Sequence, residues 1–285
     1  MHSILVICLF FLGLSMHGQT NLPPQSFHKG QFYVYWGYNR AYYNRSDVHF
    51  KGEGYDFTLE RAWAQDIPEK FDPKVYFNPT QLTVPQFNFR VGYFFRNQIA
   101  LSFGWDHMKY QLVPTQFIRI DGYIDPVKYP LEGYNGTFHH EYLLYQPGFM
   151  NYHHSDGFNF VRMGLEKYTD IWQSRSQKIH ATLHGGCNIG FMLPWTDFTF
   201  FGEHYENKPH ISGFGISVNA GARISFWKHL FIQINAQVGW SQMGDILLQH
   251  PDDARATQKI SFVERSWALG TYFNLNRKHT NVKQD

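Results

Sequence analysis

The chain has 285 residues, a formal net charge of +2 at pH 7, 19% aromatic residues and 17% charged residues. A net charge this small gives no electrostatic attraction for nucleic acid or for an acidic partner. After the first twenty residues, no apolar stretch reaches the length of about 20 residues that a transmembrane helix needs. Many aromatic residues and glycines with few charges are typical of strand-rich proteins that carry aromatic girdles at a membrane surface.

The N-terminus has the pattern of a secretory signal sequence. Residues Ile4–Leu14 form an almost unbroken apolar run that is too short to span a bilayer as a helix, and small residues follow it. Removal of this segment leaves Cys187 as the single cysteine, so no internal disulfide is expected. We therefore predict three parts: a signal peptide over residues 1–19, a barrel domain over 20–276 and a polar tail over 277–285.

The mature sequence is built from segments of about ten residues in which apolar residues alternate with polar or small ones. In Leu230–Trp240, aliphatic residues and tryptophan occupy every second position, and glutamine, asparagine and glycine occupy most of the others. Alternation with a period of two places the two sets on opposite faces of a strand. The polar set is rich in Gly, Asn, Gln and Ser, which is typical of the interior of a narrow barrel.

The lengths of the connections predict the topology. Three joins are tight, namely Arg96–Asn97, Trp172–Gln177 and Trp227–His229, whereas the other joins are long and polar. Outer-membrane barrels have short periplasmic turns and long outer loops. We therefore predict an all-β, antiparallel up-and-down transmembrane barrel in the outer membrane of a Gram-negative bacterium. Its eight strands are expected at 30–41, 84–95, 98–110, 156–170, 178–191, 212–226, 229–242 and 259–275.

A barrel of ten strands is the alternative. Tyr55–Ala64 and Thr115–Ile124 also have strand character. In the eight-strand interpretation they lie within the first and second outer loops. In the ten-strand interpretation each is a separate span, and residues 66–84 become an unusually long periplasmic link.

The end of the last expected strand carries an assembly signal. Gly270, Phe273 and Leu275 follow a G-x-x-Φ-x-Φ pattern, which resembles the motif that the outer-membrane assembly machinery recognises. In the family pattern the motif ends the chain, whereas a polar tail follows it here. In architecture the mature chain resembles the eight-stranded outer-membrane barrels, a group that includes small acyl-chain hydrolases.

Six charged residues are expected inside the barrel. An eight-stranded barrel has an interior just wide enough to be filled by side chains, so general diffusion through it is not expected. Unpaired buried charges are costly, and we expect these residues to pair across the lumen. A proton or ion path is the alternative role. The six residues are Arg90, Asp106, Arg162, Glu166, Arg223 and Glu264.

One segment has the residues of a lipid-ester hydrolase. His153 and Ser155 are two residues apart and therefore share one face of a strand, the face toward lipid by alternation. With Gly157 they form H-x-S-x-G, which resembles motifs of outer-membrane phospholipase A and the lipid A deacylases. The resemblance implies that Ser155 is the nucleophile and His153 its base, with Asn159 or Glu141 as candidates to orient the histidine. Asp156 stands where the phospholipase has Asn, and a polar strand end with an Asp-Gly turn explains the segment equally.

The remaining expectations concern ligands and partners. His139, His140, Glu141 and His153 could bind zinc, copper or nickel if the outer loops met, the third of which carries His204. Their spacing is not that of a metal site, so no metal and no cofactor are expected. Two functions remain open. One is a structural or surface-binding barrel whose loops 42–83 and 111–155 contact a surface protein or glycan, and the other is an acyl hydrolase acting on outer-membrane lipid.

Overall fold

The computed structural model describes residues 27–70, 72–76, 78, 85–227, 229–249 and 254–274. The expected signal peptide, the polar tail and Leu275 lie outside these residues. The one described helix is the short α2 (Pro73–Tyr76). Among the described residues, no helix has the length and apolar character needed to cross a membrane.

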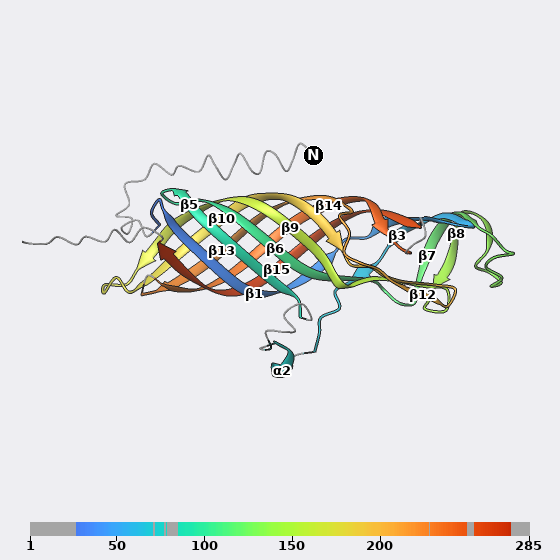
Figure 1. Cartoon of the computed structure of the whole chain (residues 1–285), viewed down its shortest axis with the longest axis horizontal. Coiled ribbons are helices and arrows are strands. Elements are labelled where there is room, and N and C mark those ends of the chain that lie inside the picture. Colours follow the sequence, from blue (N-terminus) through green and yellow to red (C-terminus); the bar gives the residue numbers. More distant parts are fainter. Residues whose placement is uncertain are drawn as a thin grey trace, which may run out of the picture.

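Eight antiparallel strands form a closed ring (Figure 1). Their order is β1-β5-β6-β9-β10-β13-β14-β15, and β15 pairs again with β1, from Gln31 opposite Asn274 to Tyr43 opposite Phe262. The prediction of an eight-stranded antiparallel barrel is therefore confirmed. The strands are β1 (Gln31–Tyr43), β5 (Phe87–Arg96), β6 (Ile99–Leu112), β9 (Met150–Gln173), β10 (Ile179–Pro194), β13 (Gly213–Phe226), β14 (Leu230–Leu247) and β15 (Arg255–Asn274).

The tight connections lie together at one end of the ring. The turns between β5 and β6, β9 and β10, and β13 and β14 are at this end, where β1 also begins and β15 ends. Gln98, Gln177 and Trp227 in these turns have positive φ angles. This end is the periplasmic end in the predicted topology.

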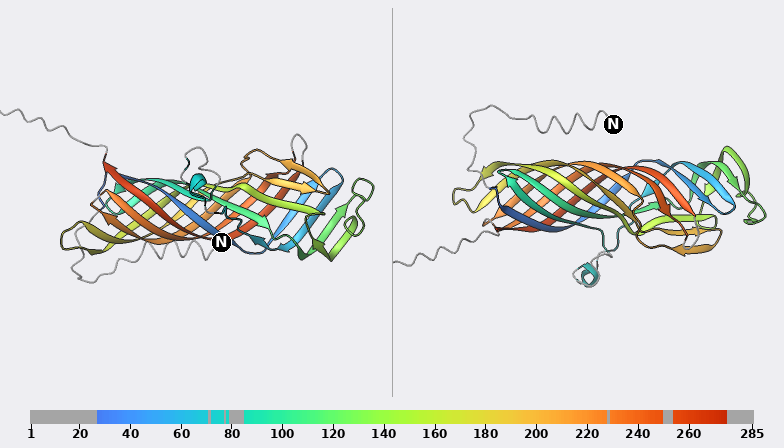
Figure 2. Two further views of the ribbon diagram at one scale, coloured as in Figure 1. Left: turned by 90° about the horizontal axis from the view of Figure 1, so that it is seen from below. Right: turned by 45° about the horizontal axis from the view of Figure 1, so that its top comes forward.

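At the other end the wall continues into a second group of strands (Figures 1 and 2). β2 pairs with the outer end of β15, and β3, β7 and β8 follow it in order. β4 pairs with β6, and β11 pairs with both β9 and β12. The bounds are β2 (Ser46–Gly52), β3 (Tyr55–Ala62), β4 (Ala64–Gln65), β7 (Gln116–Ile124), β8 (Gly136–Tyr145), β11 (Asp197–Phe200) and β12 (Glu203–Glu206).

The ten-strand alternative is wrong. Its two extra spans correspond to β3 and β7, which pair with each other and with β2 and β8 rather than within the ring. The link from β4 to β5 starts beside Leu112 and ends at Phe87, opposite His107, so both of its ends lie at the end away from the tight turns. The extra strands lengthen the wall because they continue it from β2, which pairs with the part of β15 that extends beyond the ring.

Two parts of the molecule are distinguished below. The membrane section is the ring from the tight turns to the level of Tyr42, Trp105 and Trp240. The outer section consists of β2, β3, β4, β7, β8, β11 and β12 with residues 109–112 of β6, 150–157 of β9, 243–247 of β14 and 255–258 of β15.

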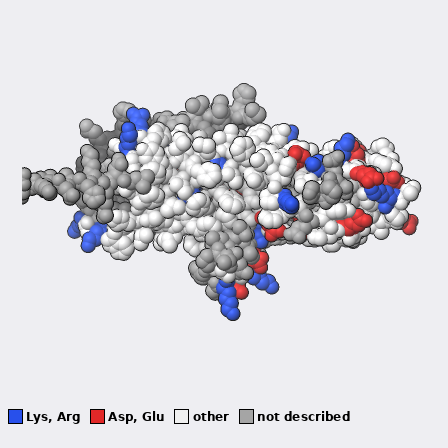
Figure 3. Space-filling view, in the orientation of Figure 1, with Lys and Arg blue, Asp and Glu red and all other residues white. Residues whose placement is uncertain are grey.

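The outward face of the membrane section is apolar. Large hydrophobic side chains are exposed on every strand pair around the ring, and the middle of the molecule in Figure 3 has few charges at its surface. An exposed apolar band with aromatic girdles is the lipid-facing surface of a barrel. Examples are Phe103, Met163, Leu183, Ile189, Ile224, Ile234, Val238 and Leu269, with Trp172, Trp227 and Phe273 near the tight turns.

The outer section has an apolar core of its own. Phe50, Phe57, Phe198 and Phe200 are at most 1% exposed and stack in series, with ring centroids 5.3 to 5.9 Å apart. Residues from β3, β7 and the β8–β9 region complete the core, including Leu59, Ile118, Ile120, Tyr145, Phe149 and Met150. The outer loops therefore form a folded extension of the barrel.

Candidate functional sites

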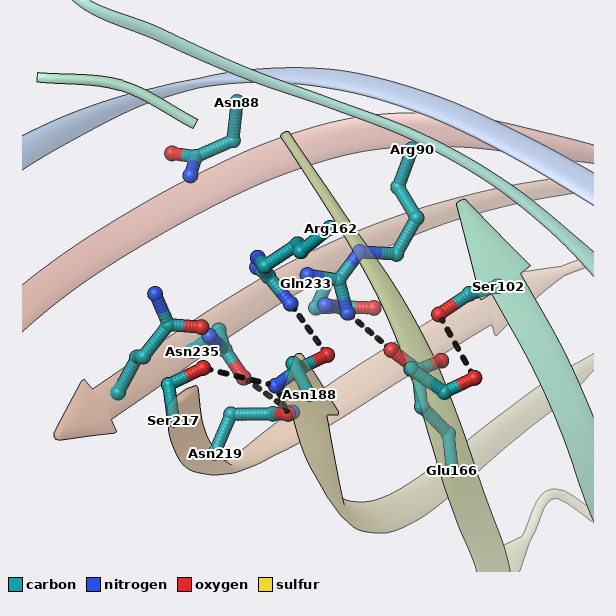
Figure 4. Close-up of polar contacts among 12 residues, drawn as sticks. Asn88, Arg90, Ser102, Arg162, Glu166, Asn188, Ser217, Asn219, Gln233 and Asn235 are labelled. Atoms are coloured by element: carbon teal, nitrogen blue, oxygen red, sulfur yellow. Dashed lines mark hydrogen bonds and ion pairs between the residues drawn. The ribbon is translucent and has the colours of Figure 1, made fainter. Parts of the chain in front are cut away.

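Charged side chains meet across the middle of the lumen (Figure 4). Arg90 of β5 forms an ion pair with Glu166 of β9, and Arg162 of β9 forms one with Asp106 of β6; each of these side chains is at most 2% exposed. Glu166 also accepts hydrogen bonds from the hydroxyls of Tyr33 and Tyr168. The pairing compensates for the cost of burying these charges.

Amides extend this network around the ring. Asn88 donates to Glu264 at 2.5 Å and to Asp106 at 2.8 Å, while Gln237 donates to the other oxygen of Glu264 at 2.8 Å. Arg162 also donates to Asn188, which donates in turn to Ser217 and Asn219. Sequence reasoning identified the charged residues of this network but not its amides, although the amides lie on the polar faces of the predicted strands.

Arg223 lies in an aromatic cluster toward the tight-turn end. Its guanidinium carbon is 3.9 Å from the ring centroid of Phe231, 4.7 Å from Tyr168 and 4.9 Å from Tyr33. The same side chain donates to Gln233 and, at 2.9 Å, to the hydroxyl of Tyr272. The buried cluster also contains Phe27, Tyr35, Phe94, Ala100 and Ala268. These side chains fill this part of the lumen, as expected for eight strands.

The structure places the candidate hydrolase residues His153 and Ser155 on the same strand, β9, with His153 beside a different partner. His153 lies on β9 in the outer section, where Nε2 is 2.9 Å from Oδ1 of Asp197, and Ser155 has no hydrogen bond to it among the described residues. A bulge follows, in which Gly157 has φ of +136°. Asn159 lies beyond this bulge and accepts hydrogen bonds from Trp105 and His107, so it does not orient His153. The structure thus pairs His153 with a carboxylate that the sequence pattern did not indicate.

The neighbouring His154 points into the core of the outer section. It is fully buried, its Nδ1 is 3.1 Å from the Thr196 hydroxyl and its Nε2 is 3.3 Å from the Tyr152 hydroxyl. Burial, with a contribution from the nearby His153, lowers the pKa of His154 to about 3. The neutral imidazole packs inside this aromatic core. Its protonation in acid would therefore destabilise the packing of the outer section.

Two other outer histidines, His140 and His204, lie beside carboxylates at the surface. His140 Nδ1 lies 2.7 Å from Glu60, and His204 Nδ1 lies 3.4 Å from Asp197, which already contacts His153. His139 and Glu141 are exposed on β8. Among the described residues, no group of three or more His, Cys, Asp or Glu side chains could hold a metal ion.

The outward face of β7 and β8 exposes aromatic side chains beside an arginine. Phe117 is 76% exposed and Tyr142 is 74% exposed, and Tyr142 lies directly opposite Arg119 in the strand pairing. Arg119 is held by Glu60, with Nε 2.7 Å from Oε2. Trp63 donates its backbone NH to Gln116, the residue before Phe117. We call Trp63, Phe117, Arg119 and Tyr142 the aromatic–arginine face.

The aromatic–arginine face adjoins the end of the extended sheet. β8 pairs with β7 on one side, and within the described part of the chain no strand pairs with its other side. Unpaired backbone groups on an edge strand are a template for an added strand. Sequence reasoning placed these residues in loops 42–83 and 111–155 but did not show which of them share a surface.

Known proteins resemble this chain in fold. No protein-family model and no curated protein sequence matches it. Among solved structures, OprG from Pseudomonas aeruginosa is 10% identical (TM-score 0.38; 87% of this chain and 99% of OprG covered). Ail of Yersinia pestis is 13% identical (TM-score 0.30; 86% and 99%), and the outer membrane protease OmpT from Escherichia coli is 7% identical (TM-score 0.26; 87% and 98%).

The class of protein follows from the architecture. A closed ring satisfies every strand's backbone hydrogen bonds, which is a requirement for crossing hydrocarbon with β-structure. The ring has an apolar outer wall and a polar, side-chain-filled interior. The chain is an integral β-barrel protein of the Gram-negative outer membrane.

Proposed function

We propose that this protein binds a protein partner outside the cell through the aromatic–arginine face and the adjoining edge of β8. The observation that carries the proposal is the exposure of Tyr142, opposite Arg119, and of Phe117, two residues before Arg119, on a sheet with a packed core. Tyr, Trp, Phe and Arg are enriched at protein interfaces and provide most of their hot spots. Burial of aromatic rings of this size against a partner removes apolar surface from water, which contributes favourable free energy to binding.

The support beneath this face favours binding over a purely structural role. Arg119 and His140 both contact Glu60, whose pKa is lowered by their hydrogen bonds, which outweigh a desolvation effect of the opposite sign. The ion pairs fix Arg119 beside Tyr142 before a partner arrives. A pre-ordered surface loses less conformational entropy on binding than a flexible loop does.

The partner should contribute an extended segment. Among the described residues no strand pairs with the outer edge of β8, where the Leu144 carbonyl accepts a hydrogen bond from Tyr134, and an added strand would place alternate side chains beside Tyr142, with Phe117 one strand further in. The test is selection of random peptides displayed on phage against the full protein in lipid nanodiscs, followed by binding to Phe117→Ser/Tyr142→Ser. Val127→Ser is the matched control, because Val127 is 88% exposed but belongs to the 125–135 loop.

We expect the selected peptides to lose at least tenfold in affinity on the double variant and to keep their affinity on Val127→Ser. Binding should also slow amide hydrogen exchange in β8. Peptides that bind both variants equally, or the absence of any enriched peptide, would contradict the proposal.

The hydrolase alternative needs a separate test. In this structure His153 contacts Asp197, and among the described residues no base is hydrogen-bonded to Ser155. We therefore expect outer membranes that contain wild type or Ser155→Ala at equal abundance to have identical lipid profiles by mass spectrometry. Fatty acid release by wild type alone would establish the acyl hydrolase and displace the binding role.

A further inference from the structure

Two arginines interrupt the apolar outer wall of the membrane section. Arg40 of β1 and Arg265 of β15 are directly opposite each other in the strand pairing and point outward. Their neighbours on the same face are apolar or aromatic: Trp267 is 55% exposed, Val263 46% and Tyr42 55%. A charged side chain that faces lipid is costly and marks a functional site.

The height of the pair places it in the outer leaflet. Arg265 lies eight residues beyond Phe273, which is exposed near the tight-turn end. At about 3.3 Å per residue and a tilt of about 40°, this corresponds to about 20 Å of an apolar band about 25 Å tall. The long arginine side chain can reach the headgroups from there. The guanidinium of Arg265 does turn toward Tyr42, two residues further out on β1, at 5.4 Å from the ring centroid.

The protein supplies an anion for only one of the two arginines. Arg40 Nε is 2.6 Å from Oδ2 of Asp66, and Oδ1 of the same carboxylate accepts a hydrogen bond from Gln86. Arg265 contacts the Tyr42 ring, and no described carboxylate lies within ion-pair distance of it. Like charges directly opposite each other destabilise a strand pair. One positive charge on the lipid-facing wall therefore lacks a counter-charge from the described part of the chain.

An outward groove of about 1230 Å³ begins at this pair. Ala220, Ala222 and Ala236 hollow the wall between larger side chains, and Ile234 and Trp267 complete an apolar lining. Lys70 joins Arg40 and Arg265 among the residues that line the groove, together with one carboxylate, Glu69, which lies 3.8 Å from Lys109. The groove crosses β10, β13, β14, β15 and β1, and four strand spacings of about 4.8 Å make it about 19 Å across, which is wider than one acyl chain.

We propose that this groove binds lipid A, with a phosphate on Arg265 and Arg40 and acyl chains along the alanine floor. A guanidinium pairs with phosphate through two parallel hydrogen bonds. Because the arginines face the membrane, their anion arrives as part of a lipid. In the outer leaflet of a Gram-negative outer membrane, the phosphorylated lipid with several acyl chains is lipid A. This inference is independent of the proposed role of the aromatic–arginine face.

The experiment is native mass spectrometry of the mature protein in a neutral detergent, titrated with bisphosphorylated lipid A. Parallel titrations use dephosphorylated lipid A, phosphatidylglycerol and inorganic phosphate. We expect lipid A to bind in preference to all three, and Arg265→Gln to weaken its binding about tenfold, the equivalent of one charge-assisted hydrogen bond. Arg265→Lys should retain part of the affinity.

Two further variants separate the head of the site from its floor. Ala236→Phe fills the groove without changing charge and should also weaken lipid A binding, whereas Arg96→Gln removes a positive charge at the opposite end of the barrel and should have no effect. A heat-dependent gel shift identical to wild type shows that each variant is folded. Equal affinity of wild type and Arg265→Gln overturns the proposal. So does binding of dephosphorylated lipid A, phosphatidylglycerol or inorganic phosphate as tight as that of lipid A.

Discussion

The two sections of this molecule distribute polarity in opposite ways on one continuous wall. In the membrane section, Arg90 and Glu166 are buried inside while Ile234 is 60% exposed outside. In the outer section, Phe57 and Ile120 are buried inside, while Lys51 and Asp56 form an exposed ion pair outside. Figure 3 shows charges gathered over the outer section and scarce over the membrane section.

The comparison shows that solvent, rather than strand geometry, decides which face is apolar. β9 passes through both sections, with Glu166 inward in the first and Tyr152 inward in the second. In the membrane section the apolar face contacts lipid. In the outer section water surrounds the wall, so the apolar face is stable only in an inner core. Along β9 the interior changes from polar to aromatic between Arg162 and Phe160, a few residues before the bulge at Gly157.

The largest expected effect comes from breaking an interior ion pair. Arg90→Leu leaves Glu166 buried without its cation, which should destabilise the barrel by about 3–5 kcal/mol. The double variant Arg90→Leu/Glu166→Leu should recover much of the loss, because no unpaired charge remains. Urea unfolding in detergent measures both free energies of unfolding. A single variant as stable as wild type would show that the network does not stabilise the barrel.

A charge added to an outward position should distinguish the two sections. Ile234→Lys places a lysine on the lipid-facing wall and should cost about 2–4 kcal/mol. Thr58→Lys, on the outward face of β3, should change stability by less than about 0.5 kcal/mol, since water surrounds it. Both are measured by unfolding in lipid vesicles. Equal costs would mean that the outer section also contacts lipid.

Acid should loosen the outer section before the membrane section. The pKa of His154 is lowered to about 3 by burial, so below pH 6.5 the unfolded outer section binds a proton that the folded one does not. Its stability is therefore full above pH 6.5 and falls as the pH decreases toward 3, with a loss of about 2 kcal/mol at pH 5. Limited proteolysis at pH 7.5 and 5 measures the effect, and His154→Phe should remove most of it.

The smallest expected effect is at a surface ion pair. The pKa of Asp56 is lowered first by a hydrogen bond from Lys51 and then by contacts with His49, against a smaller opposing desolvation effect. Because both partners are half exposed or more, Asp56→Asn should cost less than about 1 kcal/mol, and the contribution should disappear as the pH falls below about 4. Thermal unfolding of the outer section tests this. A loss as large as that of Arg90→Leu would contradict the comparison.

The sequence by itself determined the barrel. Alternation in segments such as Leu230–Trp240 and three tight turns were enough for eight strands, their direction and the inward position of Arg90, Asp106, Arg162, Glu166, Arg223 and Glu264. These features are local or follow from parity along the chain, because a period of two assigns each side chain to a face.

Only the tertiary structure decided the sites. Strand pairing brings Arg40 beside Arg265, which is more than 200 residues away, and Arg119 opposite Tyr142. His153 meets Asp197 because β11 pairs with the outer end of β9. Alternation could not show that the apolar faces of β3 and β7 contact an inner core instead of lipid. A period of two assigns residues to the two faces of a strand but does not indicate which face contacts lipid, water or core. That choice depends on which strands pair and where the ring leaves the membrane.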